Sequence, residues 1–164
     1  MSLPRVGSGL DVHPFDEARE ASLTLGGVPI DGGPALAGHS DADVVAHAVA
    51  DALLGAAAFG DLGDRFGVDR PETAGADSMV LLRNVVQDVV DAGWRVGNLD
   101  VTVVAQVPKL APYRRRMRER LADALGIDLD DVSVKFTTTD RLGAIGRGEG
   151  IGAWATCLLV PLRG

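Results

Sequence analysis

The last apolar segment of the chain limits the possible folds more than any other feature. Residues 151–162 read IGAWATCLLVPL and are apolar at almost every position, which predicts a strand. A strand with two apolar faces belongs in a sheet whose faces are both covered. Further strands are predicted at residues 4–15, 22–30, 94–108 and 131–139, and helices from Ser40 to about residue 57, at 76–93 and at 110–126. We expect segments 4–15 and 22–30 to pair with each other.

This order of elements predicts a single α/β (α+β) domain over residues 1–164, with a mixed sheet of four to five strands and helices on one face. One layer of helices covers only one face of a sheet. The apolar second face therefore predicts self-association.

The composition excludes several classes of partner. The net charge is −7, and such a surface repels nucleic acid and anionic membranes, so a phosphate site needs locally concentrated positive charge. No apolar run reaches membrane-spanning length, and the first residues do not read as a secretory signal. Cys157 is the single cysteine, so no internal disulfide forms, and we expect a buried thiol. These features predict a cytoplasmic protein.

Asp11 and His13 stand two residues apart in a predicted strand, so their side chains leave the same face. A carboxylate oxygen and an imidazole nitrogen on one face make half of a zinc site, and His47 is the best third ligand. Asp43 precedes His47 by one helical turn, so we expect it to orient the imidazole. Three such ligands leave a fourth position open, as in catalytic metal sites. The alternative is that these are ordinary polar residues near the surface.

Other polar residues suit a phosphate group. Ser40 is a good N-cap, and the first amides of a helix together with His39 suit an anion, although capping alone also explains Ser40. The segment 137–140, TTTD, and Lys109 lie at the ends of predicted strands, where α/β sheets bind ligands. A polar strand edge and a solvated lysine are the alternatives. No Ser-His-Asp or Cys-His arrangement offers a nucleophile, so these residues favour holding and polarising phosphoryl groups.

Several motifs together resemble the 2-C-methyl-D-erythritol 2,4-cyclodiphosphate synthase family. They are DVHPF, GHSDADVVAHAVADALLGAAAFGDLG, GADS, NLDVTVVAQVPKL and KFTTTDRLGAIGRGEGIGA, in order from about residue 5 to residue 162. The resemblance implies a ferredoxin-like homotrimer with active sites between subunits. It also implies conversion of a CDP-linked substrate to a cyclic diphosphate with release of CMP, in non-mevalonate isoprenoid biosynthesis.

The resemblance implies a role for individual residues. Asp11, His13 and His47 would hold one zinc ion, and Asp140 a second divalent ion, magnesium or manganese. His39 and Thr138 would be the catalytic residues that stabilise the transition state. The implied substrate-binding residues are Asp11, Val12, His13, His39, Ser40, Asp61, Leu62, Gly63, Ala105, Gln106, Val107, Pro108, Lys109, Leu110, Ala111, Thr137, Thr138, Thr139, Asp140, Ala144 and Arg147.

The chain departs from the family pattern at a few positions. Ser8 stands at a position where His is common, and Leu10 at one where Phe is common. Asp140 stands where Glu is frequent, and Ala144 where an aromatic residue is common. Segment 66–70 also differs from the family pattern. None of these is an implied zinc ligand.

Two other functions share these residues. A metal-dependent phosphohydrolase would use the same three ligands with water as its nucleophile. A non-catalytic module would bind an isoprenoid diphosphate without turning it over.

Overall fold

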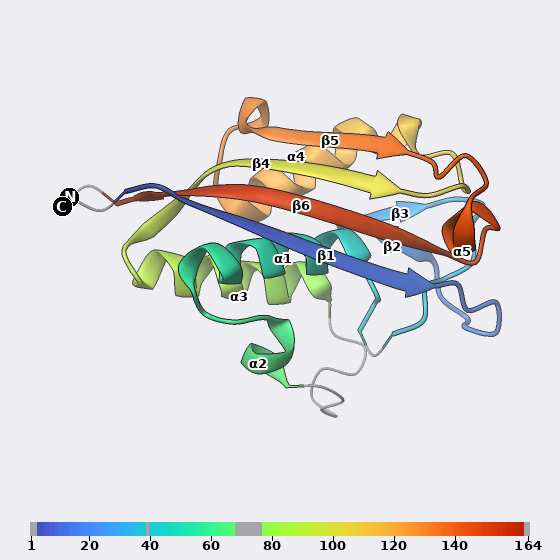
Figure 1. Ribbon diagram of the computed structural model, residues 1–164, viewed down its shortest axis with the longest axis horizontal. Coiled ribbons are helices and arrows are strands. Elements are labelled where there is room, and N and C mark those ends of the chain that lie inside the picture. Colours follow the sequence, from blue (N-terminus) through green and yellow to red (C-terminus); the bar gives the residue numbers. More distant parts are fainter. Residues whose placement is uncertain (1–2, 39, 68–76, 163–164) are drawn as a thin grey trace.

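The computed structural model describes residues 3–38, 40–67 and 77–162 (Figure 1). Its main sheet has four strands: β1 (Arg5–Pro14), β4 (Trp94–Val104), β5 (Val132–Thr137) and β6 (Gly150–Pro161), in the order β1-β6-β4-β5. Strand β6 runs antiparallel to both β1 and β4, whereas β4 and β5 are parallel. The predicted mixed sheet is confirmed, with the last apolar segment as one of its central strands.

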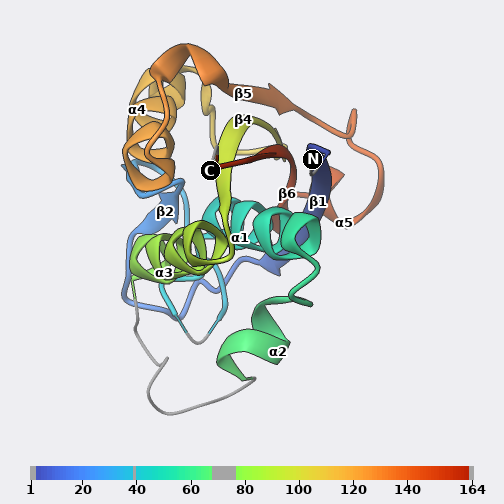
Figure 2. The same cartoon turned by 90° about the vertical axis from the view of Figure 1, so that its left-hand side faces the viewer.

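Three longer helices lie on the same side of this sheet (Figure 2). They are α1 (Val44–Ala57), α3 (Ser78–Asp91) and α4 (Arg114–Leu125). Helix α1 packs on β1 and β6, α3 packs on α1, and α4 covers β5. Shorter elements are α2 (Leu62–Phe66), α5 (Gly143–Gly146) and the 3-10 turns Ala111–Tyr113 and Leu129–Asp131. The prediction of helices on one face is therefore confirmed.

Helix α1 approaches β1 unusually closely because β1 presents glycines to it. A Cβ atom added to Gly7 would lie 1.9 Å from the Ala52 carbonyl oxygen, and one added to Gly9 would lie 2.0 Å from that of Ala48. Residues two apart on a strand share a face, so Asp11 follows these glycines on the side that meets α1. This contact brings the end of β1 within reach of side chains on the helix.

The predicted pairing of segment 22–30 with the first strand is wrong. The segment divides into β2 (Leu23–Leu25) and β3 (Val28–Ile30), which form their own antiparallel hairpin. Gly26 and Gly27 both have positive φ, 57° and 70°, as the tightest two-residue hairpin turns require. The turn folds the segment on itself, and β1 pairs with β6 instead, from Arg5 opposite Leu159 to Pro14 opposite Gly150.

The predicted start of the first helix at Ser40 is also wrong. Asp43 is the N-cap of α1, and its fully buried carboxylate accepts hydrogen bonds from the backbone N–H groups of Val45 and Ala46, each at 3.1 Å. The same carboxylate accepts the N–H groups of Gly26 and Gly27 at 2.8 and 2.7 Å. Asp43 therefore ties the start of α1 to the β2–β3 turn, and the hydroxyl of Ser40 serves another contact.

The face of the sheet opposite the helices is open, and it mixes apolar and polar side chains. Its large exposed apolar side chains are Val6, Leu10 and Val12 on β1 and Trp154 on β6, each more than half accessible. Lys135 and Asp100 lie on the same face and pair at 2.6 Å. Cys157 faces the helices and is buried, and burial raises the pKa of its thiol to about 11. Among the described residues, no helix combines the length and apolarity needed to cross a membrane.

Candidate functional site

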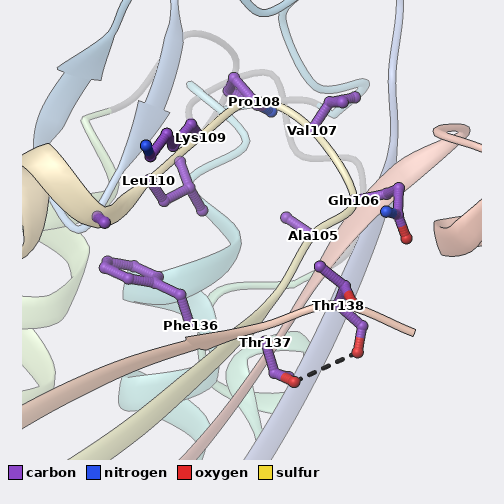
Figure 3. A pocket seen from close by; sticks show the side chains of 10 residues that line it. Ala105, Gln106, Val107, Pro108, Lys109, Leu110, Phe136, Thr137 and Thr138 are labelled. Atoms are coloured by element: carbon purple, nitrogen blue, oxygen red, sulfur yellow. Dashed lines mark hydrogen bonds between the residues drawn. The ribbon is translucent and has the colours of Figure 1, made fainter. Parts of the chain in front are cut away.

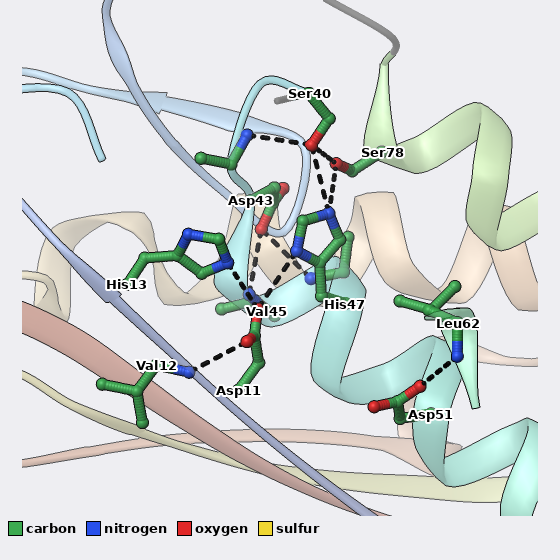
Figure 4. Close-up of polar contacts among 12 residues, drawn as sticks. Asp11, Val12, His13, Ser40, Asp43, Val45, His47, Asp51, Leu62 and Ser78 are labelled. Carbon is green, nitrogen blue, oxygen red and sulfur yellow. Dashed lines mark hydrogen bonds and ion pairs between the residues drawn. The ribbon is translucent and has the colours of Figure 1, made fainter. Parts of the chain in front are cut away.

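Asp11, His13 and His47 come together where β1 meets α1 (Figure 4). Asp11 Oδ2 lies 2.9 Å from His13 Nε2 and 3.1 Å from His47 Nδ1. One ligand atom from each residue lies within 4.8 Å of the others, a spacing at which the three could hold a metal ion. The structure thus assembles the predicted triad from one strand and one helix.

Each imidazole is held from behind by a hydrogen bond on its other nitrogen. His13 Nδ1 donates to the Ala37 carbonyl oxygen, so Nε2 is the nitrogen that faces Asp11. His47 Nε2 contacts the hydroxyl oxygen of Ser78 at 2.9 Å and that of Ser40 at 3.3 Å, so Nδ1 faces the centre. Metal-binding histidines are characteristically fixed in this way, and the arrangement fits a metal ligand set.

The role of Ser78 was not predicted from the sequence. Ser78 is 1% exposed at the first position of α3, where its hydroxyl donates to Asp41 Oδ1 and its backbone N–H donates to Asp41 Oδ2 at 3.2 Å. Asp41, Ser78 and His47 therefore form a connected series of contacts. The expectation that Asp43 orients His47 is wrong, since the Asp43 carboxylate is saturated by backbone N–H groups.

The electrostatics of the triad favour a cation. Burial would raise the pKa of the Asp11 carboxyl, but hydrogen bonds from His13 and His47 outweigh burial and hold this pKa well below its ordinary range. The hydrogen bond to Asp11 raises the pKa of His13 above 6.5, against the effect of burial. An ionised carboxylate thus lies between two imidazoles, and one oxygen with two nitrogens is a ligand set that divalent zinc accepts.

A second site is a cavity of about 370 Å³ beside the ends of β4 and β5 (Figure 3). It is lined by Ala105, Gln106, Val107, Pro108, Lys109, Leu110, Ala111, Phe136, Thr137 and Thr138. The structure thus brings the predicted segment 105–111 together with two of the predicted threonines. Phe136 was not predicted, because its place beside segment 105–111 follows from the parallel pairing of β4 with β5.

A family model, that of the YgbB family, matches residues 4–160 of this chain. This chain belongs to the YgbB family. Among curated relatives, the 2-C-methyl-D-erythritol 2,4-cyclodiphosphate synthase of Thermosynechococcus vestitus is 52% identical over 155 residues, which cover 94% of this chain and 95% of the relative.

Solved structures resemble this YgbB-family chain over most of its length. The bifunctional IspDF of Campylobacter jejuni matches with a TM-score of 0.91 and 39% identity, covering 96% of this chain and 42% of that longer chain. A CDP complex of IspF from Plasmodium falciparum matches with a TM-score of 0.85 and 34% identity, covering 98% of this chain and 97% of that one. These likenesses support the observed fold.

The predicted residues 61–63 of this YgbB-family chain lie beside α1. Asp61 is the N-cap of α2 and accepts the Asp64 N–H at 2.8 Å, and the Leu62 N–H donates to Asp51 Oδ1 at 2.9 Å. Asp51 follows His47 by one helical turn, on the same face of α1. Leu62, at the start of α2, is therefore held by a residue one helical turn from His47 (Figure 4), and Gly63 follows it in α2.

The remaining predicted residues lie in the loop after β5. Thr138 Oγ1 donates to Asp140 Oδ1 at 3.3 Å, and Thr139 Oγ1 donates to the Leu142 carbonyl oxygen at 2.6 Å. Ala144 lies in α5, and Arg147 pairs with Glu149 of its own chain at 2.5 Å. The Arg141 N–H donates to Gln106 Oε1 at 3.2 Å and so joins this loop to the cavity. Asp140 as a ligand of a second ion stays a prediction, and His39 lies outside the described residues.

Proposed function

We propose that this chain converts 4-diphosphocytidyl-2-C-methyl-D-erythritol 2-phosphate to 2-C-methyl-D-erythritol 2,4-cyclodiphosphate and CMP. The proposal rests on one observation. Over nearly its whole length, the chain is similar to proteins named 2-C-methyl-D-erythritol 2,4-cyclodiphosphate synthase. The Asp11–His13–His47 triad and the cavity beside β4 and β5 supply the two sites that such a reaction needs, one for phosphoryl groups and one for a nucleotide.

In this proposal zinc is the ion held by the triad, and magnesium or manganese accompanies the diphosphate near Asp140. Bound divalent ions neutralise and orient phosphoryl oxygens in reactions of this class. The chain contributes the geometry: Asp11 supplies a carboxylate oxygen, and Ala37, Ser40 and Ser78 hold the two imidazoles by their far nitrogens.

The reacting groups all belong to the substrate. Its 2-phosphate attacks the β-phosphorus of the same molecule, a new P–O bond closes the ring, and the bond to CMP breaks. Folding the substrate so that its ends meet supplies part of the rate, up to about 7–11 kcal/mol in the best intramolecular cases. His39 and Thr138 are the proposed catalytic residues, which stabilise the charge that develops during transfer.

The nucleotide belongs in the cavity in this proposal. A relative from Plasmodium falciparum was solved as a CDP complex, and the cavity of this chain has the size of a small-molecule site. Lys109 lies on its wall as a cation for the nucleotide side, and the hydroxyls of Thr137 and Thr138 lie at the other end for phosphate oxygens (Figure 3).

We also propose a cytoplasmic homotrimer whose active sites lie between subunits. The exposed apolar side chains of Val6, Leu10, Val12 and Trp154 on the open face give each copy a surface to bury against others. In this arrangement the triad of one copy faces the nucleotide cavity of the next.

The reaction is tested by incubating the purified, zinc-loaded protein with the CDP-linked substrate and following both products by ³¹P NMR. A cyclic diphosphate formed together with CMP supports the proposal. CMP with only linear phosphates identifies a metal-dependent phosphohydrolase, and tight binding of isoprenoid diphosphates with zero turnover under every metal identifies a non-catalytic binding module.

The shared site is tested by mixing. His47→Ala lacks a metal ligand and Lys109→Glu lacks the cavity cation, so each protein alone should be inactive. Refolding them together makes rings in which some interfaces combine an intact His47 with an intact Lys109, and part of the activity should return. Mixed trimers without recovered activity would place both residues in one subunit's site.

A further inference from the structure

The ring of Phe136 lies between the nucleotide cavity and the guanidinium group of Arg114. Phe136 lines the cavity, and the guanidinium carbon of Arg114 lies 5.1 Å from the centroid of its ring. Arg114 does not line that cavity. It lines a neighbouring depression together with Arg115 and Arg118. The arginine therefore covers the ring from the side of the depression.

Arg114 is anchored to the outer edge of the sheet. β5 is an edge strand, and its Thr137 carbonyl oxygen accepts the Ala105 N–H at 3.0 Å on the inner side. Alternate carbonyl groups of a strand point to opposite sides, so that of Val134 points outward. Arg114 Nε donates to the Val134 carbonyl oxygen at 3.2 Å, and this bond fixes the guanidinium beside the ring.

The polar and apolar parts of the cavity lie at different ends. Phe136 and Leu110 lie at one end, and the side chains of Gln106 and Thr138 lie at the other (Figure 3). A pyrimidine ring is flat and stacks on aromatic faces, whereas phosphate oxygens accept hydrogen bonds from hydroxyl groups. A nucleoside diphosphate bound here matches the cavity best with its base at the Phe136 end.

We infer that Phe136 is the stacking wall for the pyrimidine base and that Arg114 is a positioning residue that holds this wall in place. The inference rests on the proposed function and adds the residues that determine how the base is held. The guanidinium over one face of the ring is a cation–π contact, and the base packs on the side of the ring that faces the cavity. Arg114 then acts on the nucleotide through Phe136 and does not touch it.

The chain offers a matched control for Arg114. Arg118 follows it by one helical turn, and Arg118 Nε donates to the Val132 carbonyl oxygen of the same strand at 2.7 Å. Both arginines thus bind outward carbonyl groups of β5, but the ring contact belongs to Arg114. If Arg114 only supported the strand edge, substituting Arg114 and substituting Arg118 would change nucleotide binding equally.

The test measures calorimetric binding of CDP and of inorganic pyrophosphate, with KM and kcat for the CDP-linked substrate. Phe136→Leu keeps an apolar side chain of similar volume and should weaken CDP binding about tenfold, as loss of one base–aromatic stack does. Arg114→Gln should weaken it about two- to fivefold, the size of an exposed cation–π contact. Arg118→Gln should leave CDP binding unchanged, and Phe136→Tyr, which keeps the ring, should weaken CDP binding less than Phe136→Leu does.

Pyrophosphate binding should be equal in all variants. In Phe136→Leu and Arg114→Gln, KM should rise while kcat stays within about twofold, because a contact that is equal in the ground and transition states changes KM alone. Unchanged CDP binding in Phe136→Leu, or equal losses in Arg114→Gln and Arg118→Gln, would overturn the inference. An unsubstituted protein that binds CDP but forms no cyclic product would refute the proposed reaction alone, whereas one that does not bind CDP would overturn both.

Discussion

Replacing Ser78 by alanine tests how the proposed metal-binding triad is oriented. The hydroxyl of Ser78 contacts His47 Nε2 at 2.9 Å, and after its removal the remaining contact is that of the Ser40 hydroxyl at 3.3 Å. The backbone N–H of Ser78 still donates to Asp41, so the start of α3 keeps its attachment. The substitution therefore removes the better of two orienting contacts and leaves all three ligands in place.

The expected loss follows from these distances. Substituting the partner that orients a metal-binding histidine typically lowers metal affinity about 10–100-fold, or about 1.4–2.7 kcal/mol. Ser78→Ala should lower zinc affinity by an amount near the upper end of this range, because it removes the contact with normal hydrogen-bond length. Ser40→Ala removes a contact that is 0.4 Å longer, 3.3 Å against 2.9 Å for Ser78. It should lower zinc affinity by an amount at or below the lower end of the range.

Zinc affinity is measured by competition with a chromophoric chelator, after circular dichroism has shown that both variants are folded. Stoichiometric zinc should still bind to Ser78→Ala at high metal concentration. Ser78→Ala with the affinity of the unsubstituted protein, or a larger loss in Ser40→Ala than in Ser78→Ala, would refute the assigned orientation.

Three other predictions follow from the site and the fold. His47→Ala should lose stoichiometric metal, measured by plasma mass spectrometry, and nearly all turnover; full metal content would remove His47 from the ligand set. Asp11 raises the pKa of His13 above 6.5, so in the metal-free protein this pair stabilises the fold below pH 6.5 and loses that effect as pH rises through the raised pKa. Protons on His13 also compete with the metal. The increase in Tm caused by zinc should therefore grow with pH in thermal scans between about pH 5 and 8. A zinc-induced increase in Tm that shrinks with pH would contradict His13 as a metal ligand. Gly9→Ala places a Cβ atom 2.0 Å from the Ala48 carbonyl oxygen and should lower the free energy of unfolding by about 3 kcal/mol or more in urea titrations, whereas a loss under about 1 kcal/mol would disprove the close contact.

Local patterns predicted much of the fold. The periodicity of α3, α4 and the strands of the main sheet was sufficient to place them, because burial on one face sets the spacing of apolar residues. The pairing of β1 was not predictable from periodicity, because its partner β6 is more than one hundred residues away and the nearer segment 22–30 has the same alternation. The signal for the separate hairpin was Gly26–Gly27, since two adjacent glycines favour a tight turn.

The candidate site was predictable where its residues share an element. Asp11 and His13 share a face by the two-residue period of a strand, and the helix supplies His47. Ser78 lies 31 residues from His47 on another helix, so no local pattern relates them. The start of α1 was misplaced because Ser40 and Asp43 are both good N-caps, and the choice depends on the β2–β3 turn that Asp43 also binds.

The arginines along the outer edge of β5 bear on how copies of the chain meet. An exposed strand edge is a template on which another strand adds, and proteins commonly block such edges with charged side chains. Arg114 and Arg118 occupy the outward carbonyl oxygens of Val134 and Val132, so an incoming strand would have to displace two guanidinium groups before pairing. Sheet-to-sheet extension and amyloid-like stacking are therefore disfavoured at β5, which leaves the open face as the surface for the proposed association.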